Sequence, residues 1–154
     1  MINHVCEKKA EYFEFISSHF GVTFTEKSFM DPTLKVHALH EGTEIVAVLL
    51  IKKKKDNQYR ITFIRVSEEF QGKRYGHAVL NIALHDAYNE NKGPIKAFTR
   101  VKAQNIQSLN FFQAEGFKID KFECLHDTVL ENGNIVTELK PAYILNKDYD
   151  DNRI

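Results

Sequence analysis

The sequence predicts an α/β chain with an open, mixed sheet of about six or seven strands and helices on both faces of the sheet. Three observations predict it. Runs of alternating or continuous apolar residues, which are typical of strands, occur in both halves of the chain. Two segments with a helical apolar stripe interrupt these runs, and each follows a strand. The resulting order is one helix, three strands, a helix, a strand, a helix and two strands.

The composition limits the classes of function. The chain has 154 residues, enough for one domain, which we expect over residues 1–147 with a polar tail at 148–154. Lys and Arg number 21, as do Asp and Glu, so the formal charge is zero. This balance argues against a protein that coats nucleic acid or an anionic membrane. The share of hydrophobic residues, 43%, is that of ordinary globular proteins.

The two cysteines, Cys6 and Cys124, have no partner at metal-ligand spacing and favour a reducing compartment. The charged N-terminal residues do not form the apolar run of a signal peptide. The longest apolar run, Ile45–Ile51, is far shorter than the ~20 residues of a spanning helix. We therefore expect a cytoplasmic protein with neither a membrane nor a nucleic acid as its partner.

The first third of the chain predicts a helix followed by a hairpin. Ala10, Phe13 and Ile16 recur at helical spacing, and Gly21 would end that helix. Gly42 marks a tight turn between two apolar runs. We expect, in order, a helix, an irregular or short helical stretch and two strands, over residues 6–19, 22–34, 35–40 and 45–53.

The third predicted strand, over residues 59–66, changes phase part-way along. Ile61 and Phe63 keep one phase of the two-residue alternation, whereas Ile64 and Val66 keep the other. A β-bulge would produce this slip. Irregular burial along a regular strand explains it equally well.

The clearest helix is predicted over residues 76–91, where apolar residues form one stripe. Gly93 and Pro94 end it, with Gly93 expected to take a positive φ. Asn105 is a suitable cap for a further helix that Gly116 ends. The other elements expected in this half are strands over residues 95–101, 117–130 and 135–145.

The segment between the strand 59–66 and the helix 76–91 places two glycines and two cations before a helix N-terminus: Gly72, Lys73, Arg74 and Gly76. Such a segment offers unpaired backbone N–H groups and a positive dipole end, which suit a phosphate or pyrophosphate. Alone the signal is weak, because glycine before a helix is often only part of a turn. The segment matches neither the Walker loop nor the G-x-G-x-x-G fingerprint.

Two motifs together are more specific. Residues 71–76, QGKRYG, resemble the Q/R-x-x-G-x-G/A pyrophosphate loop of the GNAT superfamily of acetyl-CoA-dependent N-acyltransferases. Residues 105–117, NIQSLNFFQAEGF, are similar to that family's N-x-x-A/S-x-x-φ-Y-x-x-x-G-F segment. The resemblance is good from about residue 59 to 118. It implies that acetyl-CoA is the cofactor and that an acetyl group passes directly to a primary amine.

The resemblance also implies a cofactor cleft between the strands 59–66 and 95–101. One strand's backbone would pair with the pantetheine arm, the loop N–H groups would hold the pyrophosphate, and Asn105 and Phe112 would line the other wall. The cofactor-binding residues expected are Ile64, Arg65, Val66, Gln71, Gly72, Lys73, Arg74, Tyr75, Gly76, His77, Asn105 and Phe112.

The chain departs from the family pattern at two positions. Arg74 stands where the loop has its first glycine; arginine can hold right-handed geometry there, and its guanidinium can bind phosphate. Phe112 stands where many members have a tyrosine that protonates the leaving thiolate, and phenylalanine has no proton to donate. These departures favour an alternative, a catalytically impaired module that binds acyl-CoA or another protein.

No catalytic residue is assigned from the sequence. A general acid contributes ~10²–10⁴-fold, and a thiol with a pKa of ~8.5 leaves tolerably well without one. Water or Tyr143 could supply the proton. The amine also needs a base, a water chain or a desolvating pocket; Glu68 and Glu69 are near in sequence but are expected to be solvated. Cys6 and Cys124 lie outside both motifs, which argues against an acyl-enzyme.

The remaining polar residues carry weaker predictions. His37 and His40, three apart on a strand, would lie on opposite faces, so we expect no metal site. Arg65 and Arg100 would be exposed at strand ends, or one of them would face the acceptor. The run Lys52–Lys55 predicts a solvated hairpin tip rather than a nucleic-acid patch. The resemblance also implies a homodimer through the last strands.

Overall fold

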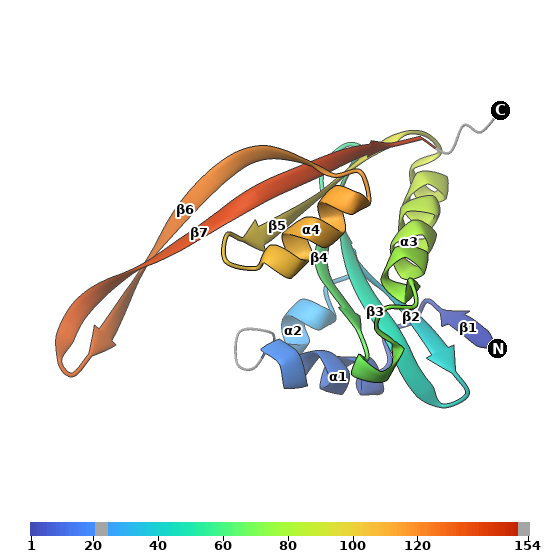
Figure 1. Cartoon of the computed structure of the whole chain (residues 1–154), viewed down its shortest axis with the longest axis horizontal. Helices are drawn as coiled ribbons and strands as arrows, with labels where there is room; N and C mark the ends of the chain where they lie inside the picture. The colour runs from blue at the N-terminus through green and yellow to red at the C-terminus, as the bar shows by residue number, and fades with distance from the viewer. Residues whose placement is uncertain (21–24, 151–154) are drawn as a thin grey trace. The chain divides into compact units, whose positions relative to one another are not determined.

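The computed structural model describes residues 1–20 and 25–150, and of residues 20, 125–131 and 136–138 the backbone alone. Seven strands form one sheet in the order β1-β2-β3-β4-β5-β7-β6 (Figure 1). The predicted mixed α/β sheet is therefore confirmed. The chain divides into two compact units: an N-terminal unit of Met1–Ala97 with Tyr149–Ile154, and a C-terminal unit of Phe98–Asp148.

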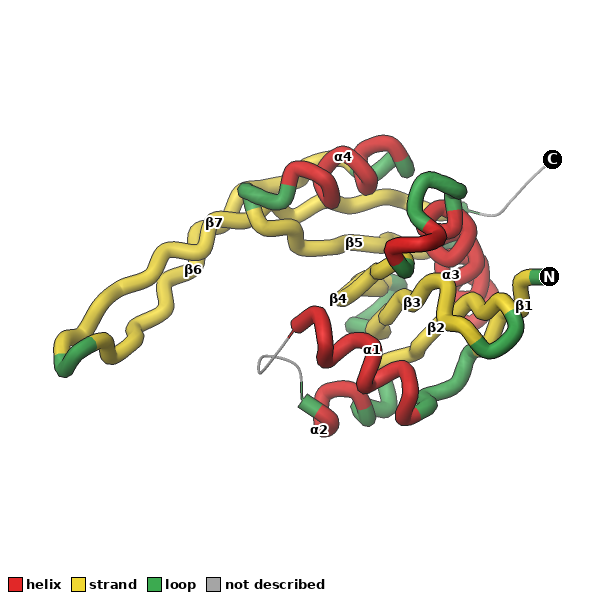
Figure 2. The backbone as a smooth tube through the Cα atoms, turned by 60° about the horizontal axis from the view of Figure 1, so that its bottom comes forward, coloured by secondary structure: helices red, strands yellow, loops and turns green. Residues whose placement is uncertain are grey.

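The N-terminal unit is built on four antiparallel strands, β1 to β4. Helices α1 and α2 cover one face of these strands and α3 covers the other (Figures 1 and 2). Its elements are β1 (Ile2–Val5), α1 (Ala10–Phe20), α2 (Glu26–Phe29), β2 (Leu34–Glu41), β3 (Glu44–Lys53), β4 (Gln58–Val66), a 3₁₀ turn (Glu68–Phe70) and α3 (Tyr75–Asn91).

The start of the chain differs from the prediction. Residues 2–5 form the edge strand β1, and helix α1 begins at Ala10 rather than at residue 6. Ala10 is exposed, whereas Tyr12 and Ile16 of α1 are fully buried. β1 has only two half-buried side chains, so its pairing with β2 rather than an apolar pattern defines it. Gly21, the predicted helix stop, lies outside the described residues.

The face under α1 and α2 contains one apolar cluster. Tyr12, Ile16 and Phe29 from the helices pack against side chains from three strands. Those strand residues are Leu34, Val36, Ala38, Val48, Leu50 and Phe63. The opposite face takes the apolar stripe of α3, whose buried residues are Gly76, Val79, Leu80, Ala83, Leu84 and Ala87. Apart from Gly76, these residues belong to the stripe that the sequence predicted; Tyr88, the other residue predicted in it, is half-buried.

The phase slip in β4 is an irregularity of strand pairing at Thr62. Leu50 pairs with Phe63 and Ile51 with Ile61, so Thr62 is an extra residue in β4. Phe63 lies in the cluster under α1 and α2, whereas Ile51 lines a pocket on the α3 face. Because paired residues share a face, Ile61 and Phe63 face opposite sides of the sheet. The change of phase therefore lies between Ile61 and Phe63, not between Phe63 and Ile64 as the sequence pattern indicated.

The turn that follows α3 is also corrected. Lys92, not Gly93, adopts the left-handed conformation, with φ +60°, and its N–H donates to the Tyr88 and Asn89 carbonyls. The hairpin turn after β3 is confirmed at residues 54–57, but Lys52 and Lys53 belong to β3 itself rather than to the tip. Two lysines of its cationic run are paired on different sides: Lys52 with Asp31 at 2.9 Å, and Lys53 with Glu90 at 3.9 Å.

The C-terminal unit combines one helix with three strands. Strand β5 (Ile95–Lys102) begins just before it, and α4 (Ile106–Ala114), β6 (Lys118–Glu131) and β7 (Asn134–Tyr149) follow. β6 and β7 form a long antiparallel hairpin (Figure 2). β7 continues to Tyr149, two residues into the segment expected to be a tail; residues 151–154 are outside the described part. No helix of the described residues is long and apolar enough to cross a membrane.

Candidate functional site

The connection from β4 to α3 is a tightly bonded turn. After β4 ends, the Ser67 N–H donates to the Val46 carbonyl at 2.8 Å, and the Ser67 hydroxyl donates to the Ile45 carbonyl. Phe70 N–H donates to the Ser67 carbonyl at 2.9 Å. The Gln71 side-chain amide donates a hydrogen bond to the Val66 carbonyl at 3.2 Å. These bonds fix the approach of the chain to α3.

The residues after this turn present backbone N–H groups without acceptors. Within the described part of the chain, the N–H groups of residues 72–76 donate to no acceptor. α3 starts at Tyr75, so its first N–H groups have no carbonyl inside the helix. The 17-residue helix adds the positive end of its dipole at this point. The loop therefore has both the hydrogen-bond donors and the positive electrostatic potential that bind an anion.

Side chains around these N–H groups add positive charge and aromatic surface. Residues 71–74 are exposed, and Gly76 is buried in the first turn of α3. The Lys73 ammonium lies 5.7 Å from the centre of the Phe70 ring. Phe70 and Tyr75 contact edge to face at 5.9 Å. All of these residues belong to the N-terminal unit.

Arg74 does not have the right-handed geometry that the sequence analysis allowed for it. It is the N-cap of α3 with φ +64°, and Gly72 two residues earlier has φ +80°. A left-handed conformation is cheap for glycine and costs other residues ~1–2 kcal/mol. The position thus has the geometry of a glycine while it carries an arginine.

This geometry predicts a stabilising substitution. We expect Arg74→Gly to raise the free energy of unfolding by ~0.5–1 kcal/mol, because relief of the left-handed strain exceeds the added entropy of the unfolded chain. The melting temperature would rise by ~1–4 °C. Arg74→Ala is the matched control: it removes the same cation but keeps a Cβ, and should give no gain in a thermal scan. Equal gains in both variants would contradict the explanation.

The end of β4 and the first turn of α3 hold four more predicted residues. Ile64 and Val66 are half-buried and Arg65 is exposed. The Asn81 side-chain amide lies 3.0 Å from the His77 Nε2 atom and donates to the His77 carbonyl at 3.0 Å. Ten of the twelve predicted residues therefore lie in the N-terminal unit, within the continuous segment 64–77. Glu68 and Glu69 are exposed, as expected.

The other two predicted residues lie in the C-terminal unit. Asn105 caps α4: its side-chain oxygen accepts the Ser108 N–H at 3.1 Å. Phe112 is 2% exposed, and its ring lies 5.2 Å from the rings of both Phe111 and Phe117. The ring is therefore part of the unit's core.

The cap predicts a matched pair of variants. We expect Asn105→Ala to lower the free energy of unfolding by ~1 kcal/mol, because the Ser108 N–H loses its acceptor. Asn105→Ser keeps a capping oxygen and should lose only a few tenths of a kcal/mol. Urea unfolding measures both values. Equal losses would show that Asn105 stabilises α4 in another way.

Two further polar residues of the C-terminal unit can now be placed. Arg100 is not exposed at a strand end. Its Nη2 atom donates to the Lys140 carbonyl at 3.4 Å, and its Nε atom lies 3.8 Å from a Glu123 carboxylate oxygen. Tyr143, the loose candidate for an acid, is half-buried in β7, with its ring 5.2 Å from that of Phe122.

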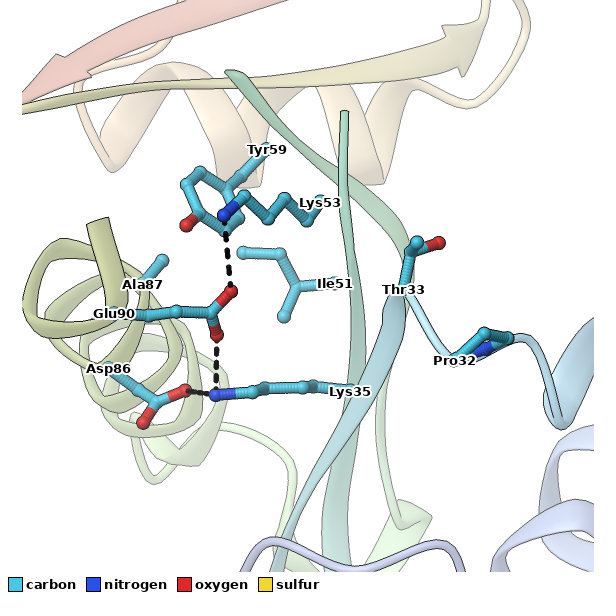
Figure 3. Close-up of a pocket in the computed structure, with 9 residues that line it drawn as sticks. All are labelled: Pro32, Thr33, Lys35, Ile51, Lys53, Tyr59, Asp86, Ala87 and Glu90. Carbon is cyan, nitrogen blue, oxygen red and sulfur yellow. Dashed lines mark hydrogen bonds and ion pairs between the residues drawn. The ribbon is translucent and has the colours of Figure 1, made fainter. Parts of the chain in front are cut away.

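A charged network that was not predicted from the sequence lies beside α3. Lys35 binds Asp86 at 2.9 Å and Glu90 at 2.6 Å along the wall of a pocket of about 150 Å³ (Figure 3). His37 is fully buried next to it, and burial lowers the pKa of its imidazole to about 4. The i, i+4 spacing of the two acids was visible in the sequence. Their strand partner was not.

The two histidines of β2 do lie on opposite faces. The His40 Nε2 atom is 2.6 Å from the Tyr12 hydroxyl, under α1, where burial raises the pKa of Tyr12 to about 12. The His37 Nε2 atom is 3.6 Å from Asp86 of α3. As predicted, the two rings cannot hold one ion together.

Comparison with known proteins identifies the family. The family model described as Acetyltransferase (GNAT) family matches residues 3–117, and the chain belongs to this family. This membership confirms the predicted acyltransferase class, with acetyl-CoA as the acyl donor and an amine as the acceptor, and it leaves the acceptor unspecified. No curated protein matches the sequence significantly.

Solved structures agree on the fold. A Bacillus subtilis acetyltransferase in complex with CoA is 18% identical, with a TM-score of 0.73 over 96% of this chain and 97% of that one. An IAA acetyltransferase from Bacillus cereus is 18% identical, with a TM-score of 0.71 over 96% and 100%. The ribosomal-protein-S18-alanine N-acetyltransferase of Escherichia coli is 13% identical, with a TM-score of 0.71 over 100% and 99%.

Proposed function

We propose that this chain is an active N-acetyltransferase that holds the pyrophosphate of acetyl-CoA at the N-terminus of α3. The observation that carries the proposal is the run of backbone N–H groups at residues 72–76, which donate to no acceptor among the described residues. Lys73 and Arg74 supply two exposed cations beside them. A diphosphate ester would accept hydrogen bonds from these N–H groups, and its negative charge would be stabilised by the positive end of the helix dipole.

In the proposed reaction, a neutral primary amine attacks the thioester carbonyl carbon. The C–N bond forms, the C–S bond breaks, the nitrogen gives up one further proton to water as it becomes an amide, and coenzyme A leaves as a thiolate that takes a proton from water. The amine arrives as an ammonium with a pKa of ~10.4 and must lose a proton first. We propose water as the carrier of that proton, since Glu68 and Glu69 are exposed. The transfer is direct, with neither Cys6 nor Cys124 acylated.

We propose residues 1–147 as the acetyltransferase domain, with the pantetheine arm along residues 64–66. The solved structures support one functional domain, because their matches extend over at least 96% of the chain. A cytoplasmic location fits the two exposed free cysteines. The ion pairs of Lys52 with Asp31 and of Lys53 with Glu90 support a function without nucleic acid, because they neutralise part of the cationic run.

We further propose a homodimer that uses the β6–β7 hairpin. Large apolar side chains are exposed along these strands, and monomers rarely leave such surfaces open. They are Ile119, Phe122, Ile135 and Leu139, which are 46%, 56%, 74% and 58% exposed. Analytical ultracentrifugation tests this proposal, with Phe122→Asp expected to give a monomer.

Thiol release from acetyl-CoA tests the activity. The amine panel contains a peptide with N-terminal alanine, a lysine-containing peptide, an alkyl diamine and aromatic amines. We expect release that depends on at least one amine, together with a higher melting temperature in coenzyme A. Stabilisation by coenzyme A without amine-dependent release across the panel would favour the alternative. That alternative is a binding module in which Phe112 and Arg74, the two departures from the family pattern, have removed catalysis.

A further inference from the structure

A group of potential metal ligands lies on the α3 face of the N-terminal unit. It joins Cys6, which follows β1, His37 of β2 and Asp86 of α3. Their ligand atoms lie within 4.8 Å of one another. Asp86 is eleven residues beyond the start of α3, which is about 16 Å along the helix axis from the pyrophosphate loop. The group is thus separate from the proposed cofactor site.

His37 is the residue that points to a ligand. Its side chain is 0% exposed, and its Nε2 atom has no hydrogen-bond partner within the part of the chain that the structure describes. The Asp86 oxygen at 3.6 Å is too far for a hydrogen bond. A buried imidazole nitrogen without a partner is unfavourable. A metal ion between His37 and Asp86 would satisfy it.

The second nitrogen of His37 is already engaged. His37 Nδ1 lies 3.0 Å from His4 Nε2, and the two rings are nearly parallel, with an angle of 13° between their planes and centroids 5.2 Å apart. When His37 Nδ1 donates its proton to His4, the lone pair of His37 Nε2 is free to bind an ion. This is the usual arrangement for a metal-binding histidine, in which an outer partner fixes the ring and its tautomer. His4 is therefore a positioning residue.

The donor set and its spacing select the class of ion. We propose that Cys6, His37 and Asp86 bind a thiophilic divalent transition-metal ion such as Zn²⁺, with water as the fourth ligand. Zinc takes sulfur, imidazole and carboxylate ligands at about 2.0–2.3 Å in a tetrahedron, so neighbouring ligand atoms stand about 3.3–3.7 Å apart. The His37–Asp86 distance of 3.6 Å meets this spacing. The exposed Cys6 side chain has the freedom to close the remaining distance.

Lys35 already forms an ion pair with Asp86 and would compete with a metal ion for it. The Lys35 ammonium lies 2.9 Å from the Asp86 oxygen that faces His37, and 2.6 Å from Glu90 (Figure 3). When Asp86 binds a metal ion, Lys35 keeps Glu90 as its partner. Removal of the Lys35 charge should therefore strengthen metal binding.

Cobalt(II) titration of the chelator-treated full chain tests the proposal. We expect visible bands of a four-coordinate Co²⁺ site with a thiolate charge-transfer band, which Zn²⁺ displaces. Cys6→Ser should abolish the charge-transfer band and weaken binding at least tenfold, while Cys124→Ser, the matched change at the other exposed cysteine, leaves both unchanged. Coenzyme A affinity should be the same in both variants.

Lys35→Gln provides the test of Asp86. We expect this variant to bind Co²⁺ at least threefold more tightly than the unaltered chain. Unchanged or weaker binding would contradict Asp86 as a ligand. The proposal as a whole is overturned by an absent charge-transfer band at millimolar Co²⁺, by a band that survives Cys6→Ser, or by equal losses in the two cysteine variants.

Discussion

Substitution of Gly76 by glutamate is expected to weaken binding of coenzyme A at least ~100-fold. Gly76 is buried in the first turn of α3, where the account places the pyrophosphate. A glutamate there adds bulk, and its carboxylate can accept the same N–H groups. Each hydrogen bond to a charged group contributes ~1.5–3 kcal/mol, so the loss of two corresponds to 100-fold or more. Calorimetric titration with coenzyme A measures the change.

An exposed pair of variants separates this effect from misfolding. Lys73→Glu with Arg74→Glu reverses two exposed charges beside the loop, and should weaken binding ~10–100-fold with little change in melting temperature. Lys27→Glu with Lys55→Glu is the control, because it makes the same change in net charge at two exposed sites elsewhere. Equal losses in the two double variants would mean that net charge, not the loop, governs binding.

Deletion of Thr62 is expected to cost ~3–5 kcal/mol of the free energy of unfolding, the loss typical of a buried phenylalanine removed from a core. Without this residue β4 pairs in register with β3, and a one-residue slip moves side chains to the opposite face of a sheet. Either Phe63 leaves the cluster under α1 and α2, or Ile61 and Tyr59 leave the α3 face. The urea midpoint should fall accordingly.

Thr62→Ala is the control for the deletion. It keeps the extra backbone residue and removes a hydroxyl whose contact with the Leu50 carbonyl is long, at 3.5 Å. We expect it to cost less than ~1 kcal/mol. If the deletion costs no more than the alanine variant, the irregular pairing is not what sets the two faces of β4.

Much of the fold could be predicted because its signals are local. The 17-residue helix α3 has an apolar stripe that repeats at helical spacing, and its bounds differ from the prediction by one residue. β1 was missed because four residues with two half-buried side chains have no such pattern. The bulge was seen as a phase slip, but its position at Thr62 follows from the pairing of β3 with β4.

The candidate sites, like the fold, could be predicted only where their residues are close together in the sequence. The pyrophosphate loop is continuous in the chain, so its glycines, its cations and the helix start could be seen together. The left-handed φ of Arg74 could not, because nothing in the side chain requires it. The group of Cys6, His37 and Asp86 comes from three parts of the chain that are up to 80 residues apart. Only the packing of α3 on β2 brings these ligands together.

Backbone amide NMR of the ¹⁵N-labelled chain tests the central claim most directly. Coenzyme A carries the diphosphate and pantetheine lacks it, so the difference between their titrations isolates the group in question. We expect coenzyme A to shift the amide resonances of residues 72–77 more than those of any other continuous segment, and pantetheine to leave them in place. Amides of 72–77 that stay unmoved at saturating coenzyme A, while others shift, would contradict it.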